Sequence, residues 1–377
     1  MGKFKSWLKA NAIFVIVVIV AVISCFIVPI DKGYLSYFDG AFETLTCIFG
    51  ILIIVAGLEN IDFFHKVARF IIKKFKSVRS IVLTLIFITY VSALINANDM
   101  ALLTFLPLSY LVLKYINKTE YLAFTFIMQN IASNLGGMIS PIGNPQNIFL
   151  FSYYNIGLLE FFKIMAIPTL CALVLIVISV MFVKPEKVEY QDKYDHKIDY
   201  YRLAVYAILF VLTFFVVIGV VPFYIVLAVT ILTMLFCDRK SFLQVDYTIP
   251  LIFVGFFIFS GNMERIPFVA NFMTKFADKQ TFLCAYISCQ FISNVPTSIL
   301  LSKFTGNFPA LLVSVNVASL GIIFSSLSGV IALKCFVKYN PKNSKHKAWY
   351  YIGFDLLMNI LLLVVLYPVS YFSLKLW

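Results

Sequence analysis

The stretch that decides the fold is residues 133–147, which read Ser133-Asn134-Leu135-Gly136-Gly137-Met138-Ile139-Ser140-Pro141-Ile142-Gly143-Asn144-Pro145-Gln146-Asn147. Its glycines allow unwound backbone, and its two prolines lack amide donors and stop a helix. No charged residue occurs between Tyr121 and Leu159, so this turn chemistry lies within a long apolar run and not in a surface loop. The stretch therefore predicts a helix that is broken at membrane depth.

The second half of the chain repeats this pattern. A second break, residues 319–329, carries serines in place of the prolines. Each break follows an apolar segment with a polar middle, 80–113 in one half and 280–302 in the other, which suits a re-entrant hairpin. Amphipathic stretches that suit surface helices precede both hairpins, at 61–73 and 266–276. This shared order predicts an internal repeat with one binding site between the two halves.

The composition identifies lipid as the main solvent. Of the 377 residues, 62% are hydrophobic and 13% are charged, and the mean hydropathy is +0.95. A soluble domain of this composition would expose large apolar patches. The net charge of +12 sits in short segments between apolar runs, which argues against a nucleic-acid-binding face. The seven cysteines and three histidines are scattered, so the sequence predicts no disulfide, no metal cluster and no cofactor.

We therefore expect an all-α polytopic membrane protein with about nine crossings, two re-entrant hairpins and two inverted-topology repeats. Residues 1–40 hold the first helix and an outer loop, 41–183 form repeat 1, 184–202 form a basic cytoplasmic linker, and 203–376 form repeat 2. Repeat 1 contains hairpin 80–113 and broken helix 121–151. Repeat 2 contains hairpin 280–302, broken helix 309–336 and a last helix, 348–374. The predicted crossings are 10–30, 41–58, 121–151, 158–183, 203–220, 222–237, 247–263, 309–336 and 348–374.

The basic residues predict the orientation, because cytoplasmic loops collect Lys and Arg. With the N-terminus inside, 23 of the 30 basic residues fall in predicted cytoplasmic segments. We expect a multi-pass protein of the cytoplasmic membrane with a cytoplasmic N-terminus and an outer C-terminus. The first hairpin then opens to the cytoplasm and the second to the outside, which makes the repeats inverted. The basic N-terminus resembles a signal peptide, but the length of its apolar run favours an uncleaved helix.

The two hairpin tips and the two breaks supply the candidate ligands. Carboxylate and amide oxygens bind small cations, and amide N–H groups bind oxyanions. The candidates for ion or substrate binding in the first half are Asn96, Asn98, Asp99, Gly136, Gly137, Ser140, Gly143, Asn144, Gln146 and Asn147. Those in the second half are Ser293, Asn294, Thr297, Ser298, Ser319, Ser325 and Ser326. The alternative is that these side chains only cap the hairpin arms.

Asp99 is the predicted coupling carboxylate. An ionisable group at midplane depth costs several kcal/mol unless it is paired, hydrated or protonated. Such a group can exchange a proton or bind a cation as the hairpin moves; the alternative is an N-cap of the second hairpin arm. Asp355 lies about 10 Å from the cytoplasmic end of the last helix, since it is some seven residues into that helix. We assign it an interfacial or structural role.

At these residues the chain resembles the ArsB/NhaD ion-transporter superfamily, which includes arsenite permeases, sodium–proton antiporters and citrate or dicarboxylate carriers. The resemblance is carried by Asn98-Asp99 with Ala101-Leu102, by 143–147, and by 293–297 with Ile299-Leu300. It covers roughly residues 41–336 and is nearest to YbiR-like inner-membrane transporters. It implies two opposed hairpins and two unwound helices around one central site, with Asn96, Asn98, Asp99, Gly143, Asn144, Asn147, Ser293, Asn294, Thr297 and Ser326 as its residues. Gly329 stands where related sequences tend to carry asparagine, which argues against a fully symmetric pair of cation sites.

The sequence thus predicts a secondary active transporter for a small inorganic ion, an oxyanion or a carboxylate, and no enzyme. Coupling to a proton or sodium gradient and alternating access around the midplane site are expected. A passive ion channel is one alternative, and an intramembrane hydrolase is a weaker one, because no histidine or second carboxylate accompanies the polar tips. The expected partners are lipid, the substrate and the coupling H⁺ or Na⁺, with no nucleic acid. No metal is expected beyond Na⁺, and a homodimer is left open.

Overall fold

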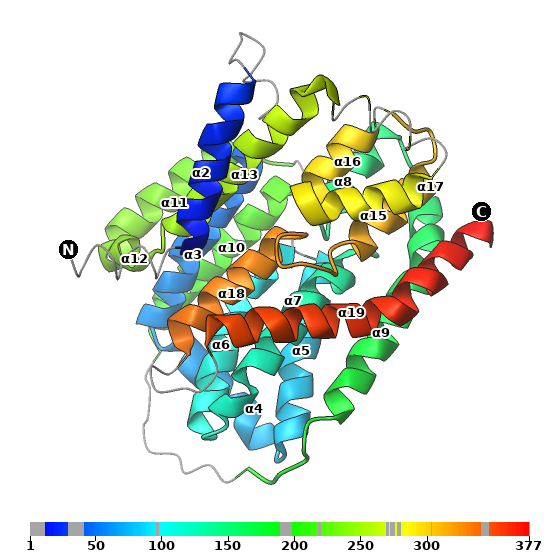
Figure 1. The fold of residues 1–377 in the computed structure, drawn as a ribbon. Helices are drawn as coiled ribbons and strands as arrows, with labels where there is room; N and C mark the ends of the chain where they lie inside the picture. Colours follow the sequence, from blue (N-terminus) through cyan, green and yellow to red (C-terminus); the bar gives the residue numbers. More distant parts are fainter. Residues whose placement is uncertain are drawn as a thin grey trace.

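The computed structural model describes residues 12–28, 41–95, 98–188, 198–217, 220–268, 271, 276, 280–302, 304–340 and 347–376. Within these ranges the chain is helical, apart from turns, loops and one isolated β-bridge between Ser77 and Lys187. The predicted all-α class is therefore confirmed. Figure 1 shows the helices in sequence colours.

The first half of the chain contains eight labelled α-helices in its described ranges, and the breaks between them are short. They are α2 (Ala12–Ile27), α3 (Ala41–Asn60), α4 (Phe63–Lys74), α5 (Val78–Ile95), α6 (Asn98–Tyr115), α7 (Leu122–Gly137), α8 (Pro145–Tyr153) and α9 (Leu158–Met181). A 3₁₀ turn, η2 (Thr119–Tyr121), precedes α7. Asp62, in left-handed backbone with φ 56°, turns the chain between α3 and α4, which are bent by 72°.

The second half repeats the order of long helix, helical hairpin and broken helix. Its described helices are α10 (Tyr200–Val217), α11 (Phe223–Cys237), α12 (Arg239–Gln244), α13 (Thr248–Arg265), α15 (Thr281–Ile292), α16 (Asn294–Ser302), α17 (Phe308–Val317), α18 (Leu327–Tyr339) and α19 (Ala348–Ser373), which ends in η3 (Leu374–Leu376). In this order, helices α15 and α16 correspond to α5 and α6, and the broken pair α17–α18 corresponds to α7–α8. Most of the predicted surface helix at 266–276 lies outside the described residues, as does 189–197 of the basic linker.

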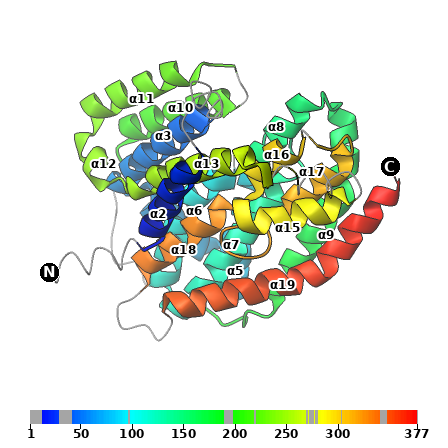
Figure 2. The same ribbon diagram turned by 45° about the horizontal axis from the view of Figure 1, so that its top comes forward.

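The helices pack into two groups. Helices α2, α3 and α10–α13 contact mainly one another, and we call them the scaffold group. Helices α4–α9 and α15–α19 form the hairpin group around α7 and α17. Figure 2 shows α3 and α10–α12 gathered at the upper left, away from α9, α15, α17 and α19. The groups meet chiefly where α3 packs on α4 and α6 and where α13 packs on α16.

A polar cluster around the buried Asp238 joins three helices of the scaffold group. Asn60 Nδ2 donates to Asp238 Oδ2 at 2.8 Å, and the Tyr206 hydroxyl donates to the same oxygen at 3.2 Å. Burial raises the pKa of Asp238, but these hydrogen bonds and one from Ser241 outweigh it and keep the pKa below its ordinary value. The carboxylate therefore stays ionised and ties α3, α10 and α12 together.

Two described helices are long and apolar enough to cross a membrane unaided, α9 and the α19–η3 segment. The bent pair α3–α4 passes the same test when it is taken together. Several shorter apolar helices accompany them, among them α2, α10, α11 and α13. The nine crossings, the re-entrant course of the hairpins and the inversion of the repeats stay predictions.

Candidate functional site

The hairpin tips contact the broken helices in the same way in both halves. The backbone N–H of Asn98, at the start of α6, donates to the Gly143 carbonyl in the first break at 3.0 Å. The backbone N–H of Asn294, at the start of α16, donates to the Ser325 carbonyl in the second break at 3.1 Å. Each helix end thus has a backbone partner in the break that follows it, as buried backbone requires. Asn96 lies outside the described residues.

The breaks of the two halves also contact each other. Asn144 Nδ2, in the first break, donates to Asn316 Oδ1 of α17 at 2.9 Å. Asn134 Nδ2, near the end of α7, donates to Ser326 Oγ in the second break at 3.3 Å. Gln146 Nε2 also donates to Asn316 Oδ1, at 3.2 Å. The two repeats therefore share one hydrogen-bond network.

We call this network the polar core. Its members are Asn98, Asp99, Asn134, Asn144, Gln146, Asn147, Asn316, Ser325, Ser326 and Ser328, and all are buried. Charge is restricted to a single side chain, Asp99. Of the predicted candidates, the network contains five from the first half and two from the second, namely Asn98, Asp99, Asn144, Gln146, Asn147, Ser325 and Ser326.

Asp99 is 5% exposed and lies in the first turn of α6. Ser328 Oγ, in the first turn of α18, donates to Asp99 Oδ1 at 2.6 Å. The same hydroxyl accepts a hydrogen bond from Asn98 Nδ2 at 2.9 Å. Within the described residues Asp99 makes no ion pair with Lys or Arg. A buried carboxylate held by a hydroxyl alone is suited to taking up a cation or a proton.

Close backbone approach explains the glycines of the first break. A Cβ atom on Gly143 would meet the carbonyl oxygens of Gly137 and Ala93. A Cβ on Gly136 would meet the Tyr90 carbonyl oxygen at 2.5 Å. Only glycine allows α5, α7 and the break to approach this closely. The predicted Gly136, Gly137 and Gly143 therefore shape the site through the backbone.

Asn147 fixes the position of α8. Its Nδ2 donates to the carbonyls of Gly137, Met138 and Ser140 at 3.0–3.3 Å, which closes the first break. Its Oδ1 accepts from Asn316 Nδ2 at 2.6 Å. Ser140 is half-buried, and its hydroxyl oxygen accepts a hydrogen bond from the Ile142 N–H. In this structure Asn147 and Ser140 hydrogen-bond to backbone groups of the break and so stabilise its conformation.

The second hairpin tip contains strained backbone. Ser293 has φ 71°, a left-handed conformation that few residues other than glycine adopt. The Thr297 hydroxyl donates to the Ser293 carbonyl at 2.7 Å, and the Ser298 hydroxyl to the Val295 carbonyl at 2.6 Å. These two hydroxyls therefore donate to backbone carbonyls of their own helical turn. Ser319 similarly donates to the Asn316 carbonyl, at 2.7 Å.

Three buried side-chain carbonyl oxygens of the polar core have no hydrogen-bond partner among the described residues. They are Asn98 Oδ1, Asn144 Oδ1 and Gln146 Oε1. Buried acceptors without donors are costly and rare in proteins. Amide oxygens are ligands for hard cations such as Na⁺. The residues present thus fit a small cation, and a thiolate or histidine cluster is absent from the described ranges.

Helix ends of both polarities meet at the polar core. The N-termini of α6, α8, α16 and α18 start at or beside its residues, and the C-termini of α7 and α17 end there. Helix N-termini carry partial positive charge and favour anions, whereas C-termini favour cations. The site therefore offers places for both signs of charge without a basic side chain.

Sequence reasoning missed three members of the polar core. Asn134 belongs to the stretch 133–147 but was not among the candidates, and Asn316 and Ser328 were also missed. The signal was present: Asn134 lies nine residues before Gly143, and Asn316 lies nine residues before Ser325. Asp355, expected near the membrane interface, is 2% exposed on α19, and Asn359 Nδ2 donates to its backbone carbonyl at 2.8 Å. Burial favours the structural over the interfacial role.

Comparisons with known proteins identify the family of this chain. A family model described as a citrate transporter matches residues 5–327. An uncharacterized transporter of Methanocaldococcus jannaschii is 30% identical over 294 residues, which cover 78% of this chain and 80% of the relative. The inner membrane protein YbiR of Escherichia coli is 23% identical over 337 residues, which cover 88% of this chain and 89% of the relative. The predicted relation to the ion-transporter superfamily is confirmed, and the chain is a membrane transporter that belongs to the citrate transporter family.

Proposed function

We propose that the protein is a secondary active transporter that carries a small carboxylate or oxyanion across the cytoplasmic membrane, driven by a sodium or proton gradient. The observation that carries this proposal is the polar core, where two hairpin tips and two helix breaks from opposite halves of the chain share one buried network. Interrupted helices that meet in this way form the central sites of secondary transporters.

An anionic cargo suits the helix ends at the core. Four helix N-termini direct partial positive charge toward the core, and the core contains no lysine or arginine. Helix ends bind a carboxylate without holding it as tightly as a buried guanidinium would. The family described as a citrate transporter makes citrate the first carboxylate to test.

The coupling ion has two candidate places. The unpartnered oxygens of Asn98 and Asn144 favour Na⁺, because both belong to side chains whose amide nitrogens are held in the same network. Asp99 is the second candidate place, and the coupling ion there would be a proton. Among the described residues, the carboxylate has the Ser328 hydroxyl and no basic side chain as its partner. Binding at either place would neutralise negative charge beside the cargo and so couple the two fluxes.

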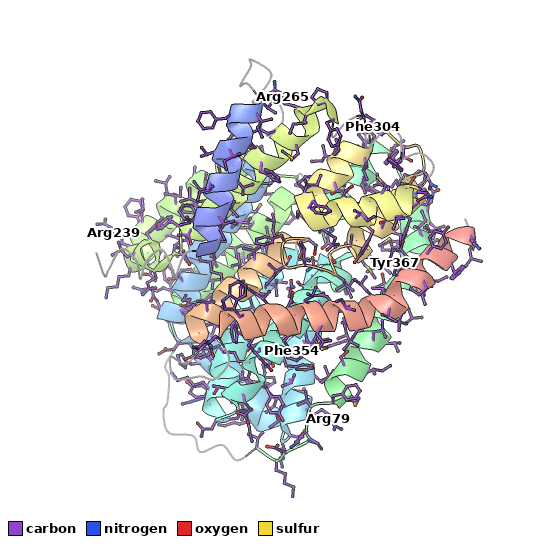
Figure 3. The ribbon with its side chains drawn as sticks, viewed as in Figure 1. Arg79, Arg239, Arg265, Phe304, Phe354 and Tyr367 are labelled. Atoms are coloured by element: carbon purple, nitrogen blue, oxygen red, sulfur yellow. The ribbon has the colours of Figure 1, made fainter. Side chains whose placement is uncertain are left out.

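Movement of the hairpin group against the scaffold group would supply alternating access. Figure 3 places Arg79, at the start of the first hairpin, and Phe304, just after the second, at opposite ends of the molecule. That separation supports inverted repeats, with the Arg79 end in the cytoplasm together with the N-terminus. The polar core then lies between the two open ends of the hairpins. A homodimer and the surrounding lipid belong to this proposal as partners.

Reconstitution tests the function directly. The full-length protein in liposomes is expected to accumulate citrate against its concentration difference when a Na⁺ or H⁺ gradient is imposed, with succinate, sulfate and arsenite as comparison substrates. Asp99→Asn is expected to lose gradient-driven uptake, because the amide cannot take up a proton and lacks the negative charge that a carboxylate offers to Na⁺. Asp355→Asn, a buried carboxylate on α19 outside the polar core, is the matched control and should retain uptake.

The same experiment separates the alternatives. With the membrane potential held at zero, a passive channel would let each substrate equilibrate but never exceed its external concentration. An intramembrane hydrolase would cleave a peptide substrate and lose that cleavage with Asp99→Asn. Absence of uphill movement for every substrate and both gradients would overturn the proposed transport function.

A further inference from the structure

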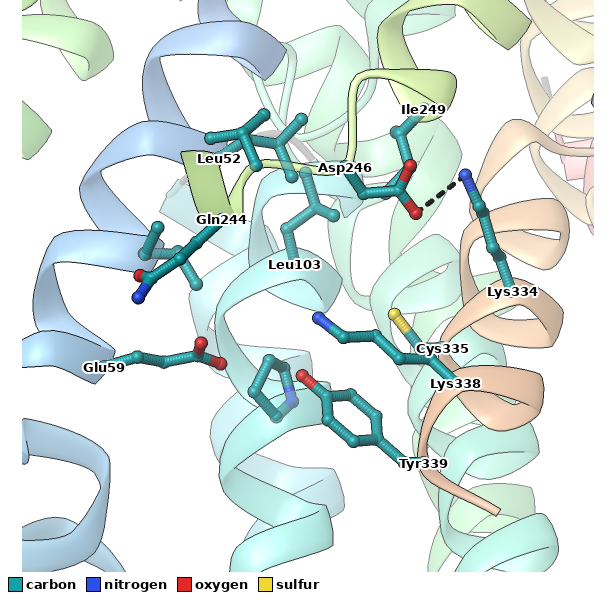
Figure 4. Close-up of a pocket in the computed structure, with 14 residues that line it drawn as sticks. Leu52, Glu59, Leu103, Gln244, Asp246, Ile249, Lys334, Cys335, Lys338 and Tyr339 are labelled. Carbon is teal, nitrogen blue, oxygen red and sulfur yellow. Dashed lines mark ion pairs between the residues drawn. The ribbon is translucent and has the colours of Figure 1, made fainter. Parts of the chain in front are cut away.

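A second polar pocket lies where the scaffold group meets the hairpin group. It has a volume of about 60 Å³. Helix α3 and the segment from α12 into α13 form one wall, and α6 and α18 form the other. Figure 4 shows its charged side chains facing one another across this boundary. We call it the lysine pocket, after Lys334 and Lys338 of α18.

The charges of the lysine pocket are divided between the two groups. Both acids, Glu59 of α3 and Asp246 before α13, belong to the scaffold group. Both bases, Lys334 and Lys338, belong to the hairpin group. Lys334 Nζ pairs with Asp246 Oδ2 at 2.8 Å, and Glu59 lies near Lys338 and accepts a hydrogen bond from Tyr339. A displacement of one group against the other would therefore separate acids from bases.

Asp246 is anchored on the scaffold side. Its Oδ1 accepts hydrogen bonds from the Thr248 N–H at 3.1 Å and from the Thr248 hydroxyl at 2.6 Å, which leaves Oδ2 to Lys334. This capping arrangement fixes the carboxylate at the start of α13. The Lys334 side chain is only 12% exposed, so its ammonium group depends on an anionic partner.

The lysine pocket adjoins the polar core along two helices. Lys334 lies six residues after Ser328 on α18, and Leu103 lies four residues after Asp99 on α6. At 1.5 Å per residue these separations are about 9 Å and about 6 Å along the helix axes. Lys338 and Glu59 are exposed and lie farther out. The pocket therefore stands between the solvent end of α18 and the site of Asp99.

We infer that the lysine pocket is a capture site for a multivalent carboxylate or oxyanion on its way to the polar core, with Lys334 and Lys338 as its ligands. The inference rests on the anionic cargo of the proposed function. In this structure the carboxylates of Asp246 and Glu59 occupy the places that the cargo's carboxylates would take. The pocket has room for only a few waters, and Lys334 already pairs with Asp246, so citrate must displace Asp246 from Lys334 to bind there.

This arrangement predicts opposite effects for the two sides of one ion pair. Asp246→Asn removes the competitor of the anion and is expected to tighten citrate binding about tenfold, since paired charges at this distance are strongly coupled. Lys334→Gln removes a ligand and is expected to weaken binding by about the same factor. A merely structural ion pair would make both variants change in the same direction. Glu59→Gln removes the other competing carboxylate and should likewise tighten citrate binding.

Cys335 provides a local readout, because it lines the lysine pocket and is 8% exposed. Full-length protein in nanodiscs is alkylated with a small maleimide in the presence of citrate, succinate or inorganic phosphate. Modification of each cysteine is followed by peptide mass spectrometry. Citrate is expected to protect Cys335 and to leave Cys237 of α11 unaffected, and the citrate dependence gives the apparent affinity of each variant. Lys240→Gln, an exposed lysine of α12, is the control for loss of positive charge.

The outcomes separate the pocket from the transport function. Protection of Cys335 with opposite shifts for Asp246→Asn and Lys334→Gln supports the capture site, even if no gradient drives uptake. Uphill citrate transport without protection of Cys335, or with equal shifts in both variants, overturns the capture site and leaves the transport function intact. Failure of all three anions to protect Cys335 also overturns it.

Discussion

Asn134 and Asn316 lie near the ends of α7 and α17, and each hydrogen-bonds to the break of the opposite half of the chain. Asn134 reaches Ser326 at 3.3 Å, and Asn316 accepts from Asn144 at 2.9 Å. Each lies nine residues before the carbonyl that caps a hairpin arm, Gly143 or Ser325. Hydrogen bonds between the two halves therefore build the polar core. Replacement of either asparagine is expected to disturb both halves.

Replacement of Asn316 by alanine is expected to destabilise the protein by about 3 kcal/mol. The change leaves the Gln146 amide without its acceptor and Asn147 Oδ1 without its donor, whereas Asn144 keeps the Asn134 carbonyl; each buried unpaired group costs about 1–3 kcal/mol. Thermal unfolding in detergent measures the effect. Thr84→Ala is the control, because the Thr84 hydroxyl only bonds the Ser80 carbonyl of its own helix. Equal losses for the two variants would contradict the shared network.

Gly143→Ala is expected to abolish transport and lower the melting temperature. The added methyl group would meet two backbone carbonyl oxygens, of Gly137 and Ala93, which cannot rotate away. Gly353→Ala is the matched control on α19, where a Cβ meets nothing within 4 Å. That variant should stabilise its helix by up to about 1 kcal/mol, because alanine loses less backbone entropy than glycine. Normal uptake by Gly143→Ala would show that the break is not closely packed during transport.

The ion pair between Lys118 and Glu186 is expected to give a stability increment over a defined pH range. Their hydrogen bond lowers the pKa of Glu186 below 4.5 and raises the pKa of Lys118 above 10.5. A lowered acid pKa stabilises the fold above about 4.5 and loses this effect in more acidic solution; a raised lysine pKa stabilises it below about 10.5.

The difference in melting temperature between wild type and Glu186→Gln is therefore expected to depend on pH in a defined way. The melting-temperature difference should be constant between these two pH values and shrink below the lower one. It should be small, because both side chains are partly exposed and salt screens them. Glu160→Gln, an exposed carboxylate at the start of α9, is the control. A difference that grows toward acidic pH would rule out the ion pair as its source.

Cysteine labelling is expected to place the two hairpin exits on opposite sides of the membrane. Asn117 lies exposed after the first hairpin, and Gly306 lies exposed after the second, where a Cβ meets nothing within 4 Å. In intact cells an impermeant maleimide should modify Gly306→Cys and leave Asn117→Cys unmodified until the membrane is opened. Peptide mass spectrometry distinguishes both from the native cysteines. Labelling of both from the same side would exclude inverted repeats.

The sequence by itself determined the membrane class and the places where helices break. Lipid as solvent follows from composition, and glycine, proline and polar residues inside an apolar run leave few conformations for 133–147. The structure has α7 end at Gly137 and α8 start at Pro145 within this stretch. The ion-transporter family could also be identified from Asn98-Asp99 and from 293–297, because such polar tips are rare in apolar segments.

Only the tertiary structure decided which side chains meet. The helices that carry Asn316, Ser328 and Lys334 are apolar around much of their circumference, so periodicity does not show which face is inward. The partners are also remote along the chain: Ser328 contacts Asp99, and Lys334 pairs with Asp246. Contacts between separate helices depend on how the scaffold and hairpin groups pack, which local sequence does not encode. The breaks were therefore predictable from the residues, whereas the shared polar core and the lysine pocket came from the packing of the two groups.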